Sequence, residues 1–571
     1  MVSGRRAPDP AAAASGDRAF FGHPRGLVGL FFAEAWERFS YYGMRALLLY
    51  YMYDQVENGG LGIPDGTAKS LIAVYGSATY MAAILGGWLS DRILGNRRAT
   101  LYGGVLIMIG HICLALPAGA GALFASMILI ASGTGLLKPT ISASVGDLYA
   151  AGDPRRDSGF SIYYMGISVG AVAAPLVVGT VGQTYDYHLG FGIAAVGMAL
   201  GLIVYVATQR HLSSVSSRPR NPLDLRRVPR SRAAFIGAAT AALIAAAAYA
   251  AGSGALSVGA VVNLISLAAI ALPIGYFTVM LRSRRTTPAE RARLRAYIPL
   301  FAAAVFFWVI QEQGATVIAQ YAGESTDLDW FGFAMPASWF QSVGSIVLIV
   351  LTPLFALLWL RLDASARPPT TAQKFSVALV IAGLSYLILV LPAGAGGLSS
   401  PLWLITSLAV VTIGEMCLAP IGLSATTRMA PAAFATQTMG LWLASNAAGQ
   451  GIAAQLVGFY DPGTAGVYFG AIGAGTLALG LLLFACSPLI RRQIERADPA
   501  PDPTADQDSA LDTASDSTTD ATPAPDPTAD QDSALDTASD STTDATPDPD
   551  SDPAGPGRGE PAARPGNGDH P

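Results

Sequence analysis

The stretch Glu34-Ala-Trp-Glu37-Arg38-Phe39-Ser40-Tyr41-Tyr42-Gly43-Met44-Arg45 places four ionisable side chains in a segment that otherwise predicts a membrane-spanning helix. Apolar residues flank it from Leu27 to Phe32 and from Ala46 to Met52. At 100° per residue, one arc of roughly 100° on this helix carries Glu34, Glu37, Arg38, Tyr41 and Arg45. Charged side chains at membrane depth are costly, and those that occur are paired and mark substrate or ion paths. The stretch therefore predicts a helix that lines the polar cavity of a transporter.

The composition of the chain agrees with a membrane protein. Of its 571 residues, 52% are hydrophobic and 13% are charged, and the mean hydropathy is +0.42. Apolar runs of about 20 residues recur, each long enough to cross a bilayer. The N-terminus has no apolar segment followed by a small-residue cleavage site, so we expect no cleavable signal peptide.

Enzymatic and metal chemistry are disfavoured by the residue inventory. The three cysteines, Cys113, Cys417 and Cys486, lie singly in apolar segments, which predicts buried thiols without a metal. The histidines are scattered, and neither a nucleophile–base set nor a nucleotide-binding loop is recognisable. We expect no enzyme activity, no ATP-driven transport, no nucleic-acid partner and no cofactor other than a proton gradient.

The apolar runs predict an all-α protein with fourteen spans in the order six, two, six. The first six lie near 27–53, 68–92, 99–117, 121–144, 158–181 and 189–208. Two Ala-rich spans near 233–252 and 256–281 lie between Arg-rich loops. The last six lie near 296–322, 338–360, 374–393, 402–426, 435–458 and 466–487. Two six-helix halves indicate the major facilitator architecture, whose site lies at the midplane between them.

This reading divides the chain into five regions and fixes its orientation. They are a cytoplasmic N-terminus at 1–26, a six-helix bundle at 27–208, the loops and insertion at 209–295, a second bundle at 296–490 and a tail at 491–571. Loops near 54–66, 182–188, 323–337, 394–401 and 459–465 contain no Lys or Arg, whereas the alternate loops are rich in Arg. The bias places both termini in the cytoplasm of a multi-pass plasma (inner) membrane protein.

The tail contains a duplicated 24-residue segment, because residues 499–522 recur unchanged at 523–546. Asp, Pro, Ala, Ser and Thr dominate it, and it has almost no large apolar side chain to bury. We expect it to be disordered. A solvated, dispensable tail is the favoured interpretation, and a regulatory or partner-binding role is the alternative.

Three further charges lie within predicted spans: Lys138 in the fourth, Glu312 in the seventh and Glu415 in the tenth, with the insertion counted separately. With the first helix, the inventory is four acids (Glu34, Glu37, Glu312, Glu415) and three bases (Arg38, Arg45, Lys138), a net charge of −1. Protonation of one glutamate would neutralise the set, as expected of a proton-coupled carrier. The alternative is a set of structural ion pairs, which seven charges divided between both halves make less favourable.

The segment from Gly86 to Arg98, GGWLSDRILGNRR, ends the second span. It resembles the cytoplasmic loop motif of the major facilitator superfamily, in which an acid and arginines gate the inner face. The matching residues are Asp91, Arg92 and Arg97. A basic stop at the membrane boundary would explain the arginines but not the Gly and Asp spacing.

The first-helix stretch resembles the Glu-x-x-Glu-Arg-Phe-x-Tyr-Tyr-Gly signature of the proton-coupled oligopeptide transporter (POT) family. Other segments also resemble that family: 135–139, 160–170, 307–314, 339–342, 371–375, 414–415 and 439–442. The resemblance covers about 25–490, and bacterial members carry two extra helices between the halves, as predicted here.

The resemblance implies roles for the intramembrane residues. Arg38, Lys138 and Tyr42 would hold a peptide's carboxylate and Glu415 its amino terminus, pairings that suit the charges. Side-chain pockets would be lined by Tyr41, Tyr80, Trp308 and Trp442. Glu34 and Glu37 would serve in proton coupling, and Arg45 would pair with Glu312 to close the outer side until Glu312 is protonated.

Two positions depart from the family pattern. Ser168 and Gly344 stand where asparagines are usual, and those asparagines normally help to hold the amino end of the peptide. The loss of two neutral hydrogen-bond partners would cost roughly 1 kcal/mol each. An atypical, N-modified or larger peptide-like substrate is therefore an alternative.

Three functions follow as hypotheses. The first is a proton-coupled symporter, working as a monomer, that imports di- or tripeptides or peptide-like compounds. The second is a proton-coupled carrier or exporter of a non-peptide or modified-peptide compound on the same scaffold. The third, a receptor whose acidic tail carries the output, is disfavoured.

Overall fold

The computed structural model describes residues 20–149, 155–219, 257–330, 332–363, 368–395 and 397–497, together with 153 and 222. The predicted span near 233–252 and the repeated tail at 499–546 lie outside these residues. Within them the regular secondary structure is helical except for one hairpin of two short antiparallel strands, β1 (Asp329–Trp330) and β2 (Phe333–Ala334).

The first half of the chain forms a set of long helices that we call the N-terminal half. They are α2 (Gly26–Tyr53), α3 (Asp65–Leu89), α4 (Asn96–Ala115), α5 (Gly119–Gly146), α6 (Arg156–Ala174), α7 (Thr180–Thr184) and α8 (Tyr187–Thr208). Short helical turns connect or extend them: η1 (Val56–Asn58), η2 (Ser90–Leu94), η3 (Pro175–Gly179), η4 (Gln209–His211) and η5 (Ser214–Ser217).

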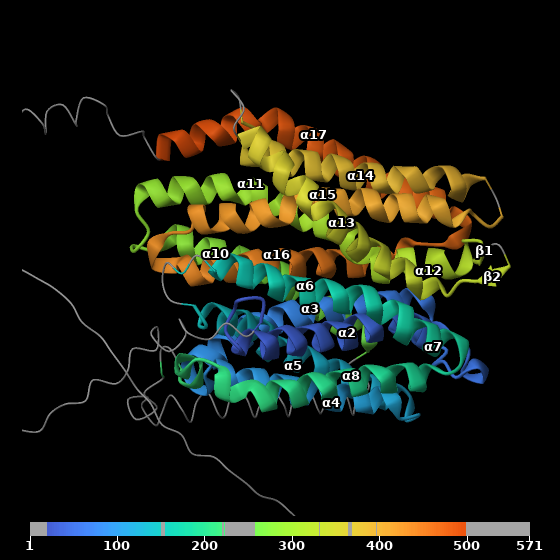
Figure 1. Ribbon diagram of the computed structural model, residues 1–571. Helices are drawn as coiled ribbons and strands as arrows, with labels where there is room; N and C mark the ends of the chain where they lie inside the picture. Colours follow the sequence, from blue (N-terminus) through green and yellow to red (C-terminus); the bar gives the residue numbers. More distant parts are fainter. Residues whose placement is uncertain are drawn as a thin grey trace, which may run out of the picture. The chain divides into compact units, whose positions relative to one another are not determined.

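The insertion contributes α10 (Val258–Arg282), which leads into the C-terminal half. That half contains α11 (Pro288–Gln311), α12 (Val317–Glu324), α13 (Phe340–Asp363), α14 (Thr371–Gly394), α15 (Pro401–Met429), α16 (Ala435–Leu456) and α17 (Ala465–Ala497). Its short turns are η6 (Glu312–Ala315), η7 (Ala337–Trp339), η8 (Ala432–Phe434), η9 (Val457–Phe459) and η10 (Pro462–Thr464). In Figure 1 the long helices of both halves run alongside one another.

Every predicted span except the one near 233–252 coincides with a long helix. Eleven helices of the described residues are long and apolar enough to cross a membrane. Two others, α2 and α16, are equally long but more polar: α2 carries the four charged side chains, and α16 carries Asn446, Gln450 and Gln455. Both helices bring several polar groups to the interior.

Local sequence explains where several helices begin. At α11 the Thr287 hydroxyl accepts from the backbone N–H of Glu290, and the Glu290 side chain accepts from the N–H of Thr287. Thr370 and Gln373 form the same reciprocal cap at α14. Such caps satisfy backbone donors that have no partner within the helix and contribute about 1 kcal/mol.

Glycine pairs let helices cross closely in both halves. A Cβ on Gly133 of α5 would lie 2.6 Å from the carbonyl oxygen of Gly103 in α4. In the C-terminal half, a Cβ on Gly383 of α14 would lie 2.7 Å from the carbonyl oxygen of Gly473 in α17. Small residues at such crossings allow the backbone contact that drives helix association in lipid.

The predicted span at 296–322 is interrupted at Glu312. The α-helix α11 ends at Gln311, and Glu312 begins the 3₁₀ turn η6 before α12 continues. The interruption places Glu312 at a point where the backbone leaves α-helical geometry. Irregular backbone at membrane depth is tolerated where protein or a cavity surrounds it.

Candidate functional site

A cavity of about 980 Å³ lies between the two halves of the molecule. Helices α2, α3, α5 and α6 line it from the N-terminal half, and α11, α13 and α15 line it from the C-terminal half. The predicted substrate-binding residues that line it are Arg38, Tyr41, Tyr42, Tyr80, Lys138, Ser168, Trp308, Gly344 and Glu415. Arg45 and Glu312 also line it.

Trp442 lies elsewhere. It is buried on α16, and its ring occupies the space left by the missing side chain of Gly422 on α15. The structure thus places Trp442 in the packing between α15 and α16 rather than among the residues that line the cavity.

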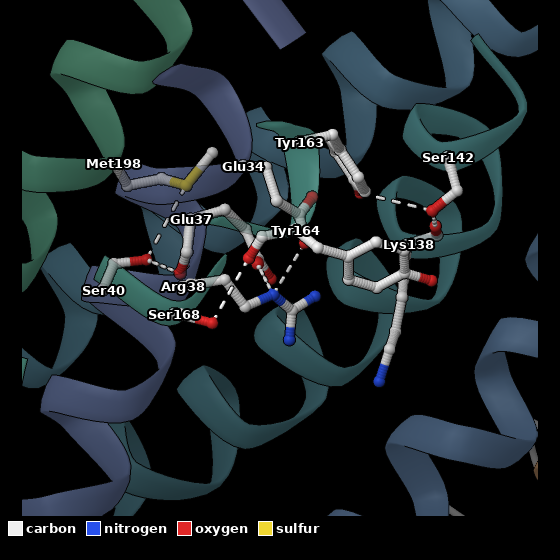
Figure 2. A network of polar contacts seen from close by, with 10 residues as sticks. All are labelled: Glu34, Glu37, Arg38, Ser40, Lys138, Ser142, Tyr163, Tyr164, Ser168 and Met198. Atoms are coloured by element: carbon white, nitrogen blue, oxygen red, sulfur yellow. Dashed lines mark hydrogen bonds and ion pairs between the residues drawn. The ribbon is translucent and has the colours of Figure 1, made fainter. Parts of the chain in front are cut away.

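One wall of the cavity is cationic. Arg38 projects from α2, and Lys138 from α5, where its Nζ lies 4.2 Å from the centre of the Tyr80 ring. Figure 2 shows the Arg38 guanidinium and the Lys138 ammonium extending toward the same side. Two cations beside tyrosine rings form a site suited to a carboxylate.

Glu34 and Glu37 lie behind this wall, in the interior of the N-terminal half. The Arg38 Nε lies 2.8 Å from Glu34 Oε1 and 2.8 Å from Glu37 Oε2 (Figure 2). Their side chains are 1% and 0% exposed. Glu34 Oε2 and both oxygens of Glu37 have no hydrogen-bond partner. One guanidinium therefore serves two carboxylates that are isolated from solvent. Burial of these charges costs desolvation free energy, so the group is a candidate functional site.

The opposite wall carries the acid Glu415 on α15. Its Oε2 accepts a 2.8 Å hydrogen bond from the Nε2 of Gln311, the last residue of α11. The cavity therefore has a cationic pole in the N-terminal half and an anionic group in the C-terminal half. A zwitterion that spans the cavity could neutralise both.

Arg45 and Glu312 connect the two halves. The Arg45 Nη2 donates to Glu312 Oε2 at 2.6 Å, and the Asn446 Nδ2 donates to Glu312 Oε1 at 3.0 Å. Both carboxylate oxygens thus have donors. Neither Gln311 nor Asn446 was among the residues predicted from sequence. Gln311 directly precedes the charged Glu312 in the sequence, which is its only sequence signal. Asn446 has none, because it meets Glu312 only in the folded protein.

The two residues that depart from the family pattern lie on facing helices. The Ser168 hydroxyl on α6 donates to the carbonyl of Tyr164 in its own helix at 3.3 Å (Figure 2). A Cβ on Gly344 of α13 would lie 3.1 Å from Thr412 Oγ1. This part of the wall therefore offers a substrate one hydroxyl, already bonded within its helix, and one residue without a side chain.

Further hydrogen bonds join the halves at what we call the outer end, where α2 ends and α3 begins. The Tyr50 hydroxyl donates to the Ala319 carbonyl at 2.8 Å, and the Lys69 Nζ donates to Gln320 Oε1 at 2.5 Å. Where α7 meets η7, the Trp339 indole donates to Thr180 Oγ1 at 2.7 Å. The cavity is therefore closed at the outer end, with Arg45 and Glu312 beneath the closure.

The residues of the loop motif lie where α3 meets α4. Asp91 and Arg92 belong to η2, a π-type turn that extends α3. The Arg97 Nε donates to Gln209 Oε1 at 3.3 Å, so this side chain contacts the end of α8 within its own half. Gly95 has a φ of +76°, which explains a glycine at this sharp connection.

Comparison with known proteins places these features in a family. A family model described as the POT family matches residues 97–473. The Bacillus subtilis "Uncharacterized transporter YclF" is 50% identical over 84% of this chain and 96% of its own length. The "Di-/tripeptide transporter" of Lactococcus lactis subsp. cremoris is 41% identical over 82% of this chain and 96% of its own.

A solved structure shares the fold. The crystal structure of a "peptide transporter POT in complex with sulfate" is 51% identical, covers 85% of this chain and 99% of its own, and superposes with a TM-score of 0.82. The helical scaffold is thus that of an all-α major facilitator fold. The chain belongs to the POT family of transporters.

Proposed function

We propose that the protein is a proton-coupled symporter that imports di- or tripeptides or peptide-like compounds by alternating access. The observation that carries this proposal is the polarity of the cavity: Arg38 and Lys138 line one wall and Glu415 lines the other. A peptide in solution at neutral pH is a zwitterion, and its two ends match the two poles. The relative from Lactococcus lactis bears the name of a transporter of that substrate class.

The charges divide into binding and coupling groups. Arg38, Lys138 and Tyr42 would bind the peptide carboxylate, and Glu415, held by Gln311, would bind the amino end. The rings of Tyr41, Tyr80 and Trp308 line the space left for side chains. No residue needs to form a covalent bond with the substrate, because alternating access requires only that the substrate binds at one open end of the cavity and leaves at the other.

Proton coupling would work through the Arg45–Glu312 ion pair. While Glu312 is ionised, the pair ties α2 to the α11–η6 junction beneath the closed outer end. A proton on Glu312 removes its charge and with it most of the attraction to Arg45. The halves can then separate at the outer end. Glu34 and Glu37 would exchange a proton beside the carboxylate-binding Arg38, so that substrate and proton affect the same guanidinium.

We also propose the cellular setting. The helices lie in the plasma (inner) membrane with both termini in the cytoplasm, and the outer end faces outward. The protein works as a monomer, since both walls of the cavity come from one chain. The predicted tail boundary at 491 falls inside α17, which continues to Ala497. The segment after this helix, residues 498–571, is dispensable for transport in this proposal, so its deletion should leave uptake unchanged.

The test is uptake of labelled dipeptides into proteoliposomes under an inward proton gradient. The wild type should accumulate dipeptide. Glu312→Gln should abolish gradient-driven accumulation but retain counterflow, because a permanently neutral group cannot release a proton. Absence of gradient-driven uptake of every peptide tested, with folded protein, would refute the proposal.

A second candidate function is transport of an N-modified or larger peptide-like compound on the same scaffold. It is favoured by Ser168 and Gly344, because the Ser168 hydroxyl is already bonded within its own helix and Gly344 has no side chain to offer a substrate. Dipeptides and their N-acetylated counterparts should be compared as competitors of uptake, in the wild type and in Glu415→Gln. A peptide carrier loses at least about tenfold in affinity for the free-amine peptide in this variant, because a charge-assisted contact is removed. If N-acetylated compounds compete better in the wild type, the second function is correct.

A further inference from the structure

The gating carboxylate Glu312 begins a chain of side-chain amides along α16. Asn446 donates from Nδ2 to Glu312 Oε1 at 3.0 Å, and its Oδ1 accepts from the Nε2 of Gln450 at 2.6 Å. Asn446 and Gln450 are 4% and 2% exposed. They lie four residues apart and therefore one above the other on the same face of the helix. We call these two side chains the amide relay.

The direction of the hydrogen bonds in the amide relay is set by Glu312. An ionised carboxylate only accepts, so Asn446 must turn its NH₂ group toward it. That choice leaves the Asn446 oxygen facing Gln450, which must then turn its own NH₂ group toward Asn446. The oxygen of Gln450 is left pointing to the far end, where it occupies the notch formed by Gly76 of α3.

We propose that the amide relay reverses its hydrogen bonds when Glu312 takes up a proton, and that it thereby carries the protonation state of the gate to the contact between α3 and α16. The proton adds to Glu312 Oε1, which then becomes a donor. Asn446 rotates its amide to offer Oδ1 to this hydroxyl and Nδ2 to Gln450. Gln450 rotates in turn, accepts through Oε1 and presents its NH₂ group at Gly76. No bond other than the new O–H forms, and only hydrogen bonds exchange.

The far end of the amide relay lies in a contact that must change during alternating access. Beside Gly76, the Ser77 hydroxyl donates to the Ala447 carbonyl at 2.9 Å and joins the N-terminal half to the C-terminal half. Gly76 has no side chain, and a Cβ at this position would collide with the Gln450 amide. The Gln450 amide thus fills space in a tight interhelical contact, where exchange of an oxygen for an NH₂ group changes the packing against α3.

Other charged groups act on Glu312 and belong in any account of its pH response. Arg45, Tyr41 and Tyr42 on α2, Tyr80 on α3, Lys138 on α5 and Glu415 on α15 interact with it electrostatically. The amide relay is distinct, because its neutral side chains respond to the charge through the direction of their hydrogen bonds.

This inference rests on the proposed proton coupling through Glu312. One variant tests it by imposing the reversed orientation on the Asn446 amide. Gln450→Glu introduces a carboxylate that only accepts, so Asn446 must give it the NH₂ group and turn its oxygen toward Glu312. That orientation favours protonated Glu312. We expect the pH midpoint of dipeptide counterflow, measured in proteoliposomes without a gradient, to rise by about one unit. A shift of this size corresponds to the free energy of one hydrogen bond to a charged group.

A new negative charge would also raise the midpoint by simple electrostatics, so the control is a double-mutant cycle. In an Asn446→Leu background the amide that transmits the reversal is absent, and Gln450→Glu should shift the midpoint by less than half as much. Gln455→Glu is the matched control on the same helix: Gln455 bonds to Ser266 of α10 instead and should leave the midpoint unchanged.

Equal shifts of the pH midpoint in both backgrounds would contradict the proposed reversal of hydrogen bonds in the amide relay. If Gln450→Glu does not fold, Gln450→Met in the same two backgrounds replaces it. It removes the donor that holds Asn446 in place, so it should raise the midpoint slightly only when Asn446 is present. Failure of the proposed function gives a different result: Glu312→Gln would keep the wild-type pH profile and proton-driven accumulation.

Discussion

The two ion-pair groups on α2 are built in opposite ways. Arg45 reaches 2.6 Å to Glu312, 267 residues away in the chain, and both Glu312 oxygens have donors. Arg38 instead serves two glutamates of its own helix, and three of their four oxygens have no hydrogen-bond partner. Both residues of the first group line the cavity and are 17% and 10% exposed, whereas only Arg38 of the second group lines it and all three of its side chains are 5% exposed or less.

In the proposed mechanism this difference separates two roles. The Arg45–Glu312 pair is a latch, by which we mean an ion pair that breaks when the outer end opens, and Glu34 and Glu37 form a proton-exchange site. Glu312 accepts from Arg45 across the interface and from Asn446 within its own half, so only the Arg45 contact is lost when the interface opens. Glu34 and Glu37 have their one cationic partner, Arg38, on their own helix, so opening of the interface between the halves does not by itself separate them from it. The proposed mechanism therefore assigns movement to Arg45 and Glu312, and proton exchange to Glu34 and Glu37.

The largest effect expected from this comparison is on stability. Arg38→Ala would leave two buried carboxylates without their cation, and removal of one partner from a buried ion group costs about 3–5 kcal/mol. The free energy of unfolding, measured in detergent by denaturant titration, should fall by that amount. The control is Arg45→Ala, whose loss should be about 1.5 kcal/mol, the value of one hydrogen bond to a charged group. Equal losses would contradict the comparison.

A second, smaller effect concerns conformation. Glu312→Gln should shift the protein toward an open outer end, because the neutral amide attracts Arg45 weakly. Spin labels at Val56 and Phe333, which are 72% and 55% exposed near the outer end, would report the distance between η1 and β2. The distance distribution should lengthen in the variant. The exchanged pair, Arg45→Glu with Glu312→Arg, should restore the wild-type distribution, and its failure to do so would argue against a simple latch.

The helix that decides the fold could be read from sequence because its signal is local. A stripe of charges on one face of an apolar helix needs no partner to be recognised, and Glu34, Glu37, Arg38 and Arg45 are all in that stripe. The predicted spans in the described residues coincide with helices for the same reason, since apolar length alone defines them. Charges in the other half, such as Glu415, were found by the same argument.

The rest depends on tertiary contacts that no local pattern encodes. Asn446 and Gln450 are ordinary polar residues of a helix until the structure places Asn446 against Glu312. Trp442 matched a family segment, but its ring packs on Gly422 rather than in the cavity wall. The break of the seventh span at Glu312 was also not predicted, because the residues of η6 and α12 are compatible with a continuous helix.

The smallest effect expected concerns a titratable group outside the membrane spans. Burial lowers the pKa of His23 below its usual 6.5, and the nearby Arg155 guanidinium lowers the pKa further, while Asp153 opposes it. The folded protein therefore resists protonation of His23, and stability falls as the pH drops below about 6.5. His23 Nδ1 lies 2.9 Å from the Tyr149 hydroxyl, a contact outside both ion-pair groups.

The melting temperature of the wild type should fall between about pH 7.5 and pH 5.5, and His23→Gln should accordingly reduce this fall. The reduction should be only a few degrees, because the protonation of one histidine contributes little to the free energy of unfolding. The pH profile of transport should stay as in the wild type, because this group has no part in coupling. A displaced transport profile would show that proton coupling is not confined to the groups on α2 and their partners.

The measurement that tests the central claim most directly is peptide-driven proton movement. Liposomes that contain the protein and a pH-sensitive dye are given external dialanine with the membrane potential clamped at zero. The account predicts acidification of the lumen with the wild type and none with Glu312→Gln, although both still exchange labelled dipeptide. Peptide uptake without acidification in the wild type, or equal acidification in the variant, would contradict proton coupling through the Arg45–Glu312 latch.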